Sequence, residues 1–285
     1  MHIRRRIIAI FCFMLMLFNQ YHLECSAGSK HQSSYETALS KIYKGMTTAE
    51  VVNAIGEPSK LSPYGRMCLI YSFDGNEDLY FWFDNNNQNS EELFLSEITT
   101  IYGIDILGDG LSRAELANVA TVLYSRITQR FEFDVPEHGP FDDIADSSYK
   151  KQINYAYFLG LMNGVGEGLF LPDRKASRCE IIVVLYRVID CTKKQQGLSV
   201  NEQEIIISDY YYIPEWAREE VKKMTPKYNL LDNKNAFNPN KSMDNFTLYK
   251  IILEILNGDA GNTEDGSVSC GVTEGRQGTV LCLVN

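Results

Sequence analysis

Hydrophobic and polar residues repeat with two different periods along the chain, and the change of period separates two domains. Three segments between positions 67 and 101 are dense in aromatic and β-branched residues and are typical of strands: 67–73, 78–83 and 93–101. Before them, Thr47 and Glu50 form a Thr-x-x-Glu capping box, which opens a helix that ends at Gly56, and a shorter helix is expected at 35–42. Residues 34–102 are therefore predicted to form a small α+β domain, with two helices and a three-stranded antiparallel meander.

After residue 104 the apolar residues recur at helical spacing instead. One stripe with the spacing i, i+3, i+4, i+7 and i+8 predicts an amphipathic helix: Ile153, Ala156, Tyr157, Gly160 and Leu161. We expect this helix to end at Gly164. Ser177 and Glu180 then form a Ser-x-x-Glu capping box, and the helix that they open is apolar almost all round over 181–189, which is typical of a buried helix.

The helical part repeats itself. The segments LSRAEL, ASRCEI and KSMDNF place serines at equal spacing, at Ser112, Ser177 and Ser242. Upstream, FDDIAD and ISDYYY align Asp143 with Asp209, and LFLPD and AFNPN keep a Phe and a Pro in register. Each unit is predicted to be a helix, a Gly-rich loop and a second helix, although the first unit has no evident first helix. The sequence thus predicts an all-α domain at 104–257 built from three divergent repeats, at 104–130, 141–190 and 207–257.

These segments resemble the S-layer homology (SLH) repeat, whose pattern is an FxDV opening, a helix, a GYGDGTFxP loop and a TRAE start of the second helix. The middle repeat matches throughout, with FDDI at 141–144, GVGEGLFLP at 164–172 and SRCE at 177–180. The first repeat matches at GDG (108–110) and SRAE (112–115). The third carries Met243 where the arginine is expected, and it matches at Asp209, Trp216, Phe237 and Pro239.

An exposed arginine in the first turn of a helix is repelled by the helix dipole and destabilises the helix by about 0.3–1 kcal/mol. The presence of Arg113 and Arg178 in such positions therefore calls for an explanation. Free N–H groups at a helix start bind anions, and a guanidinium can hold a carboxylate with two hydrogen bonds. In the SLH family, the resemblance implies such a pocket between neighbouring repeats, for an anionic secondary cell-wall polysaccharide that is often pyruvylated. Carried over by position, the candidate glycan-binding residues are Arg113, Arg178, Gly108, Gly110, Gly166, Gly168, Asp143, Asp209 and Trp216.

A purely structural role remains open for each candidate. Arg178 could pair with Asp143 or Glu180 and only tie the repeat together. Asp143 and Asp209 could be helix caps, and Trp216 could belong to the core. Because the arginine is missing from the third repeat, at most two pockets are expected to be intact.

The N-terminal domain has a motif of its own. It contains GMT at 45–47, EV at 50–51, Gly56 and Pro58, in the order GMT-x-x-E-V-x-x-x-x-G-x-P. This resembles the SmpA/OmlA-type and β-lactamase-inhibitor-protein-like domains. The resemblance implies a small protein-binding or scaffold module without catalysis, so a protein partner is expected there. The side chains of Tyr80, Trp82 and Phe83 are either ordinary strand packing or an exposed recognition face.

The first 27 residues are typical of a secretory signal peptide. Three arginines at 4–6 precede an apolar run at 7–18, and Cys25-Ser26-Ala27 fits cleavage after Ala27. The run is too short to span a bilayer, although a retained anchor or a lipid-modified Cys25 stays open. We therefore expect a secreted protein of the cell wall or cell surface, in a Gram-positive-type envelope, with no membrane span in the mature chain.

Charge and cysteines narrow the function classes. The formal net charge is −10, which disfavours nucleic acid as a partner because that affinity depends on neutralising phosphates. No Cys/His cluster with metal-ligand spacing occurs, so neither a metal nor another cofactor is expected. Cys270 and Cys282 lie in the Gly-rich tail at 258–285 and could close a disulfide hairpin.

Catalytic motifs are missing from the sequence. It contains no G-x-S-x-G, H-E-x-x-H or Walker pattern, and we expect that the protein is not an enzyme. Two hypotheses follow. The repeats either bind wall glycan and anchor the chain, or they are only a scaffold for a secreted protein–protein interaction module.

Overall fold

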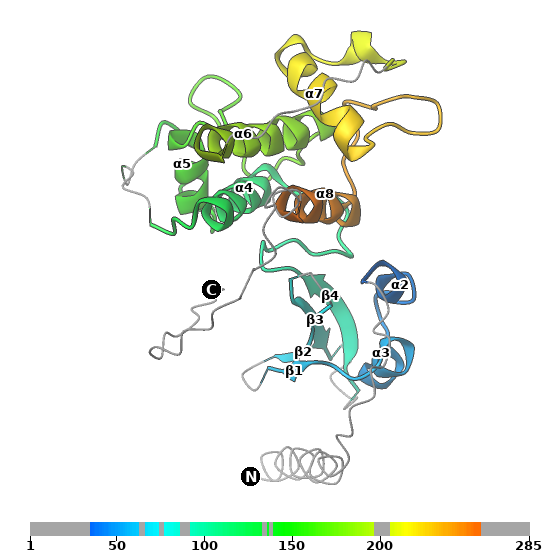
Figure 1. Cartoon of the computed structure of the whole chain (residues 1–285). Coiled ribbons are helices and arrows are strands. Elements are labelled where there is room, and N and C mark those ends of the chain that lie inside the picture. The colour runs from blue at the N-terminus through cyan, green and yellow to red at the C-terminus, as the bar shows by residue number, and fades with distance from the viewer. Residues whose placement is uncertain are drawn as a thin grey trace.

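The computed structural model describes residues 35–62, 66–73, 77–85, 92–132, 136, 139–196 and 206–257. A sheet with two short helices forms one end of the molecule, and a layered group of helices forms the other (Figure 1). The expected fold class, an α+β part followed by a helical part, is confirmed at this level.

The sheet has the order β1-β2-β3-β4, and every neighbouring pair is antiparallel. Its strands are β1 (Lys60–Leu61), β2 (Met67–Tyr71), β3 (Leu79–Asp84) and β4 (Phe94–Thr99). The three expected strands are present, but the predicted three-stranded meander is wrong by one strand. Because β1 has only two residues, both exposed, it carries no alternation of apolar and polar positions that a sequence pattern would detect.

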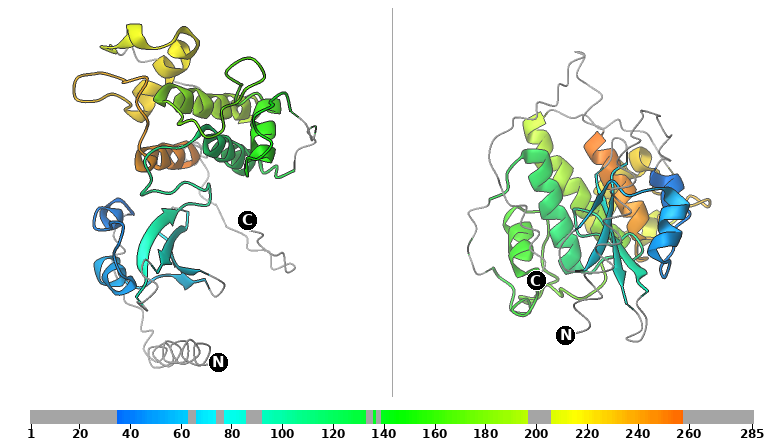
Figure 2. Two further views of the ribbon diagram at one scale, coloured as in Figure 1. Left: turned by 180° about the vertical axis from the view of Figure 1, so that it is seen from behind. Right: turned by 90° about the horizontal axis from the view of Figure 1, so that it is seen from below.

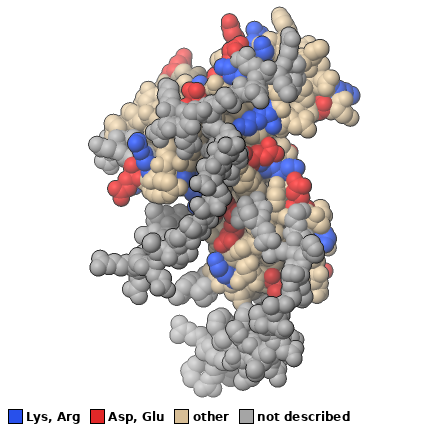
Figure 3. Space-filling model, viewed as in Figure 1, with Lys and Arg blue, Asp and Glu red and all other residues tan. Residues whose placement is uncertain are grey.

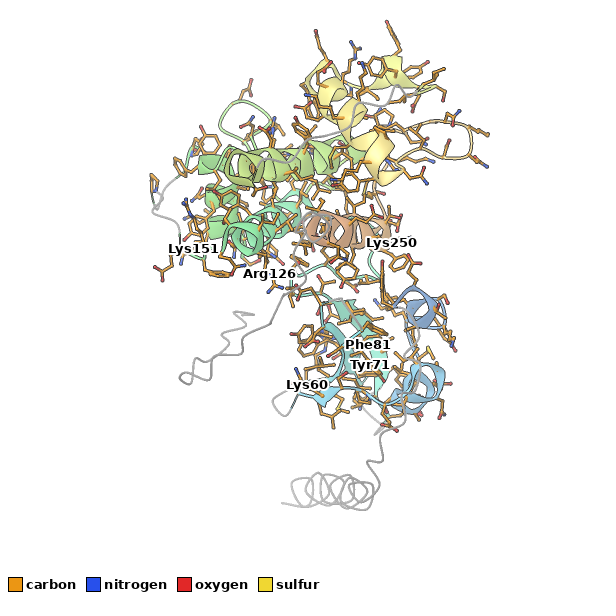
Figure 4. The ribbon with its side chains drawn as sticks, viewed as in Figure 1. Lys60, Tyr71, Phe81, Arg126, Lys151 and Lys250 are labelled. Carbon is orange, nitrogen blue, oxygen red and sulfur yellow. The ribbon has the colours of Figure 1, made fainter. Side chains whose placement is uncertain are left out.

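Helices α2 (Tyr35–Leu39) and α3 (Thr48–Ile55) lie on one side of this sheet in all views (Figures 1 and 2). The predicted capping box of α3 is confirmed, since the Thr47 side chain accepts from the Glu50 N–H and the Glu50 carboxylate accepts from the Thr47 N–H. Tyr71 and Phe81, whose ring centroids are 4.8 Å apart, mark the sheet's buried face (Figure 4).

The helical domain contains α4 (Arg113–Thr128), α5 (Lys150–Phe158), α6 (Arg178–Gln196), α7 (Arg218–Tyr228) and α8 (Asn245–Asn257). Two 3₁₀ turns, η1 (Tyr210–Tyr212) and η2 (Glu215–Ala217), precede α7. In the predicted repeat scheme, α5 and α7 take the places of the first helices of the second and third repeats, and α4, α6 and α8 take those of the second helices. The equivalent positions Leu116, Ile181 and Leu248 are all fully buried. The described residues 100–112 that join β4 to α4 form no helix, so the first repeat lacks its first helix.

Helix α5 ends earlier than the sequence suggested. Its last residue is Phe158, and Gly160 turns the chain with φ = 72°. Gly164 has a packing role instead. A methyl group there would lie 2.6 Å from the carbonyl oxygen of Leu169 and 2.6 Å from the ring of Phe141.

The cap of the third repeat is not Ser242. Helix α8 begins at Asn245, and the Asp244 carboxylate accepts the N–H of Thr247 at 2.8 Å, as an N-cap does. Asp244 is therefore the equivalent of Ser177. Met243 corresponds to the buried Ala176, so the position of the repeat arginine is filled by Asn245.

The two domains meet at α2 and α8. The ring of Tyr35 lies 6.2 Å from Phe246 and 6.1 Å from Tyr249, and Lys250 Nζ lies 2.9 Å from the Glu36 carboxylate. A second ion pair joins Arg126 of α4 to Glu77, beside the sheet. Figure 4 shows Arg126 and Lys250 on the side of the helical domain that faces the sheet domain.

Candidate functional site

The three repeats close on one another through the starts of their second helices. At the first junction, Arg113 N donates to Arg174 O at 2.9 Å, across to the loop of the second repeat. At the second junction, Arg178 N donates in the same way to Lys241 O of the third repeat, at 2.8 Å. The third junction brings residues 242–245 against the GDG segment of the first repeat. The backbone of each of the two arginines therefore contacts the loop of the next helix–loop–helix unit.

The guanidinium of Arg113 is enclosed at the first junction. Its side chain is 4% exposed, and its Nε and Nη2 donate to Phe170 O and Asn163 O, both at 2.7 Å. Nη1 pairs with the Glu180 carboxylate, and Cζ lies over the Phe170 ring, 4.5 Å from its centroid. Each of the three guanidinium nitrogens of Arg113 therefore has a partner within the protein.

Glu180 serves two functions at this junction. It accepts the Ser177 N–H at 2.9 Å, which completes the predicted capping box, and it also pairs with Arg113 and Arg174. Burial alone raises the pKa of Glu180, but the Ser177 N–H and the two arginines outweigh it, so the net pKa is lowered. The carboxylate is thus charged and fully used within the protein.

Arg178 is held much more loosely at the second junction. Nη2 donates to Leu230 O at 2.7 Å, and Cζ lies 5.4 Å from the centroid of the Phe237 ring. The described residues provide no salt bridge to Arg178, and its Nε is buried without a hydrogen-bond partner. The reason is visible in the repeat, because Thr247 occupies the position that Glu180 has at the first junction.

Three carboxylates nevertheless influence Arg178. Burial lowers the pKa of its guanidinium, and Asp244, Asp232 and Asp209 raise it in part. Each of these carboxylates accepts backbone N–H groups, and none is within salt-bridge distance of Arg178. The charge of Arg178 is therefore balanced only at a distance.

Asp143 and Asp209 fix the conformation of the two loops that carry Phe170 and Phe237, the rings over which the arginines stack. Asp143 accepts the N–H groups of Phe170 and Leu171 at 2.9 and 2.7 Å. Asp209 accepts those of Phe237 and Asn238, both at 2.7 Å. Both aspartates are positioned to shape the junctions, and neither presents an unused carboxylate to a ligand.

The four candidate glycines lie in two different parts of the helical domain. Gly166 and Gly168 belong to a tight turn of the second repeat, where Gly168 has φ = 73° and a methyl group would lie 3.0 Å from the Asp142 carboxylate. Gly108 and Gly110 line the third junction. A methyl group at Gly108 would lie 2.8 Å from Asn245 Nδ2, and that amide donates to Asp105 O at 2.7 Å. At this junction, Asn245 takes the place that an arginine has at the other two.

Trp216 lies in η2 and is 53% exposed, so it is not part of the core. Two neighbours that sequence reasoning missed are still more exposed, Tyr211 at 85% and Tyr212 at 72%. The sequence shows the tyrosine run that follows Asp209, but not which of its rings are exposed.

The described surface is of mixed charge. Basic and acidic side chains are interspersed over the face in Figure 3. Within the described ranges, no three His, Cys, Asp or Glu side chains are placed to share a metal ion. None of the described helices combines the length and apolarity needed to cross a bilayer. The expected signal peptide at 1–27, the tail at 258–285 and the Cys270–Cys282 pair lie outside the described residues.

Residues 140–182 match the family model of the S-layer homology domain. The match covers the middle repeat from its FDDI opening to Glu180, and so confirms the SLH resemblance there. It links the chain to attachment at the cell wall or cell surface. The first and third repeats and the SmpA/OmlA resemblance lie beyond the matched residues and stay predictions. No curated protein matches the chain.

Proposed function

We propose that the protein is exported and is held non-covalently at the cell wall by an anionic, pyruvylated secondary wall polysaccharide. The binding site is the second junction, and Arg178 is its centre. The observation that carries this proposal is the unequal state of the two repeat arginines. Arg113 is paired with the Glu180 carboxylate and with two backbone carbonyl groups, whereas Arg178 lacks a carboxylate partner among the described residues.

A ligand carboxylate would supply what the second junction lacks. At the first junction, the Glu180 carboxylate neutralises the arginine that lies over a phenylalanine ring. At the second, the same ring is present as Phe237, but Thr247 offers no charge. A pyruvyl carboxylate placed against Arg178 would reproduce the arrangement of the first junction, with a charge-assisted hydrogen bond.

The surrounding acids set the strength of this interaction. Asp209, Asp232 and Asp244 give the second junction a negative background that opposes an anionic ligand. Arg178 is only partly buried, so salt still screens a part of its attraction for an anion. We therefore expect one contact to be weak and polymer retention to depend on ionic strength.

Sedimentation with purified wall polymer tests the proposal. The protein should pellet with pyruvylated polymer, and Arg178→Gln should reduce the pelleted fraction. Arg187→Gln is the matched control, because it removes the same charge from the same helix. Among the described residues, the Arg187 guanidinium has one hydrogen bond, from Nη1 to Leu161 O at 3.3 Å. Equal retention of wild type and Arg178→Gln would reject the assignment of the site.

A second candidate function is a protein-interaction module for which the repeats are only a scaffold. The burial of Arg113 and the closed third junction favour it, because both use the repeat positions for internal contacts. Under this hypothesis, the N-terminal domain binds a protein partner, with the partly exposed Tyr80 and Trp82 on the face of the sheet opposite Phe81. A protein that fails to pellet with any wall polymer would favour this candidate.

Two further parts of the proposal concern processing and chemistry. We propose cleavage after Ala27, which mass spectrometry of the exported protein would show as a mature N-terminus at Gly28. We also propose that the chain has no catalytic activity. Release of sugar from the wall polymer by the purified protein would contradict that part.

A further inference from the structure

Three exposed aromatic side chains stand between Asp209 and α7. Tyr211 is 85% exposed, Tyr212 is 72% exposed and Trp216 is 53% exposed. We refer to these three residues as the aromatic ridge. Exposed aromatic groups that occur together, rather than singly, mark binding surfaces.

The backbone beneath the aromatic ridge is anchored on both sides. Ile213 and Ala217 are buried between and beside the exposed rings. Arg218 Nε donates to Ile213 O at 3.0 Å, and its guanidinium lies 5.7 Å from the Tyr210 ring. Tyr210 is thus turned toward the protein, while its two neighbours in η1 point to solvent. The exposed rings are carried by a fixed segment, which reduces the entropy lost when a ligand binds.

The aromatic ridge is continuous with the second junction. Asp209 immediately precedes η1, and it accepts the N–H groups of Phe237 and Asn238. The Phe237 ring is the one over which the Arg178 guanidinium lies. In addition, η2 packs against α6, the helix that begins with Arg178.

We propose that the aromatic ridge is a second carbohydrate subsite, which stacks uncharged sugar rings of the same wall polysaccharide whose carboxylate binds Arg178. This rests on the proposed function. Tyr and Trp combine a flat apolar body with a polar tip, and a sugar ring likewise has C–H faces and hydroxyl edges. The rings of Tyr211 and Tyr212 are 6.0 Å apart and inclined by 81°. Together they can contact one sugar on its face and on its edge.

Charge argues for an uncharged sugar over other occupants. Glu215, Glu219 and Glu220 flank the aromatic ridge, and the nearest arginine, Arg218, is engaged with Tyr210 and Ile213. An anionic membrane or a nucleic acid would be repelled there. The polymer therefore places its neutral rings on the aromatic ridge and its charged group at Arg178.

The test compares affinity for purified wall polymer at low and high salt. The double variant Tyr211→Ala/Tyr212→Ala should lose about tenfold in affinity at both salt concentrations, since stacking is not screened. Arg178→Gln should lose affinity mainly at low salt. Tyr43→Ala, which removes a tyrosine that is 62% exposed in the other domain, should bind like wild type.

Each outcome decides between the two proposals. Wild-type affinity of the double tyrosine variant overturns the subsite, while a loss with Arg178→Gln alone keeps the proposed function. A loss with the tyrosine variant alone keeps the subsite and removes the arginine site. If the wild type binds no wall polymer, both are overturned. The double variant Tyr211→Phe/Tyr212→Phe is the control for stacking. It keeps both rings and should keep most of the affinity for the polymer, so a loss of affinity as large as that of the alanine variant would contradict stacking. A change in oligomeric state or in binding to phosphatidylcholine vesicles, without a change in polymer affinity, would also overturn the subsite.

Discussion

The guanidinium of Arg113, in the first repeat, pairs with the carboxylate of Glu180, in the second. The same carboxylate caps the helix to which it belongs. One acid therefore joins two repeats and starts a helix, and the arginine that a sequence motif assigns to ligand binding is used for assembly. The second junction has kept the arginine without that acid, and this difference separates a structural arginine from a candidate binding arginine.

Breaking the first junction should destabilise the protein strongly. Arg113→Ala leaves Glu180 partly uncompensated and removes donors from two carbonyl groups, which should cost roughly 3–5 kcal/mol. Arg174→Ala removes the other partner of Glu180, but its side chain is 41% exposed, so about 1 kcal/mol or less is expected. Urea unfolding of both variants measures the free energy of unfolding. Equal losses would show that Arg113 is not enclosed as described.

The first junction should also make stability depend on pH. The folded pKa of Glu180 is lowered, so its contribution is complete above the ordinary glutamate pKa of roughly 4.3 and is lost as pH falls through the folded value. Unfolding free energies measured between neutral pH and acid should therefore decline more steeply for wild type than for Glu180→Gln. Parallel curves for the two proteins would contradict the lowered pKa.

Two buried tyrosines should respond in opposite ways to loss of their hydroxyl groups. Tyr249, at the domain interface, is fully buried and its hydroxyl has no hydrogen-bond partner among the described residues. Tyr249→Phe should leave stability unchanged or raise it slightly. Tyr71 is equally buried but donates to Gly56 O at 3.0 Å, so Tyr71→Phe should cost about 1 kcal/mol. Thermal unfolding of the two variants tests this prediction. A larger loss of stability for Tyr249→Phe than for Tyr71→Phe would contradict it.

The closed third junction predicts a difference between two glycines. Gly110 and Gly160 both have positive φ, at 68° and 72°, so alanine strains either by roughly 1–2 kcal/mol. At Gly110, the added methyl group also lies 3.1 Å from Ser242 Cβ, whereas at Gly160 it meets nothing within 4 Å. Gly110→Ala should therefore unfold at lower denaturant concentration than Gly160→Ala. The reverse order would mean that the third junction is open.

Local features of this fold follow from the sequence, and long-range ones do not. The capping boxes at Thr47 and Ser177 were predictable because cap and acid lie three residues apart. The pairing of Arg113 with Glu180 was not, because it depends on how two repeats pack. The cap at Asp244 was missed for a related reason. Equal spacing of serines favoured Ser242, whereas the loop packing that aligns Phe170 with Phe237 places the helix start two residues later.

The same distinction between local and long-range features applies to the candidate site. The motif singled out Arg113 and Arg178, but burial decides what each side chain can bind, and burial is a property of the packed structure. Exposure of the tyrosines at 211 and 212 was equally invisible, since an aromatic run is as typical of a core as of a surface.

The most direct test of wall attachment through Arg178 is a cycle that combines a protein variant with a ligand variant. Affinities of wild type and Arg178→Gln are measured by calorimetry for the wall polymer before and after removal of its pyruvyl groups. If the guanidinium holds the carboxylate, either change should lower affinity, and the two together should lower it no further than one alone. Losses that simply add, or no loss with Arg178→Gln, would contradict the account.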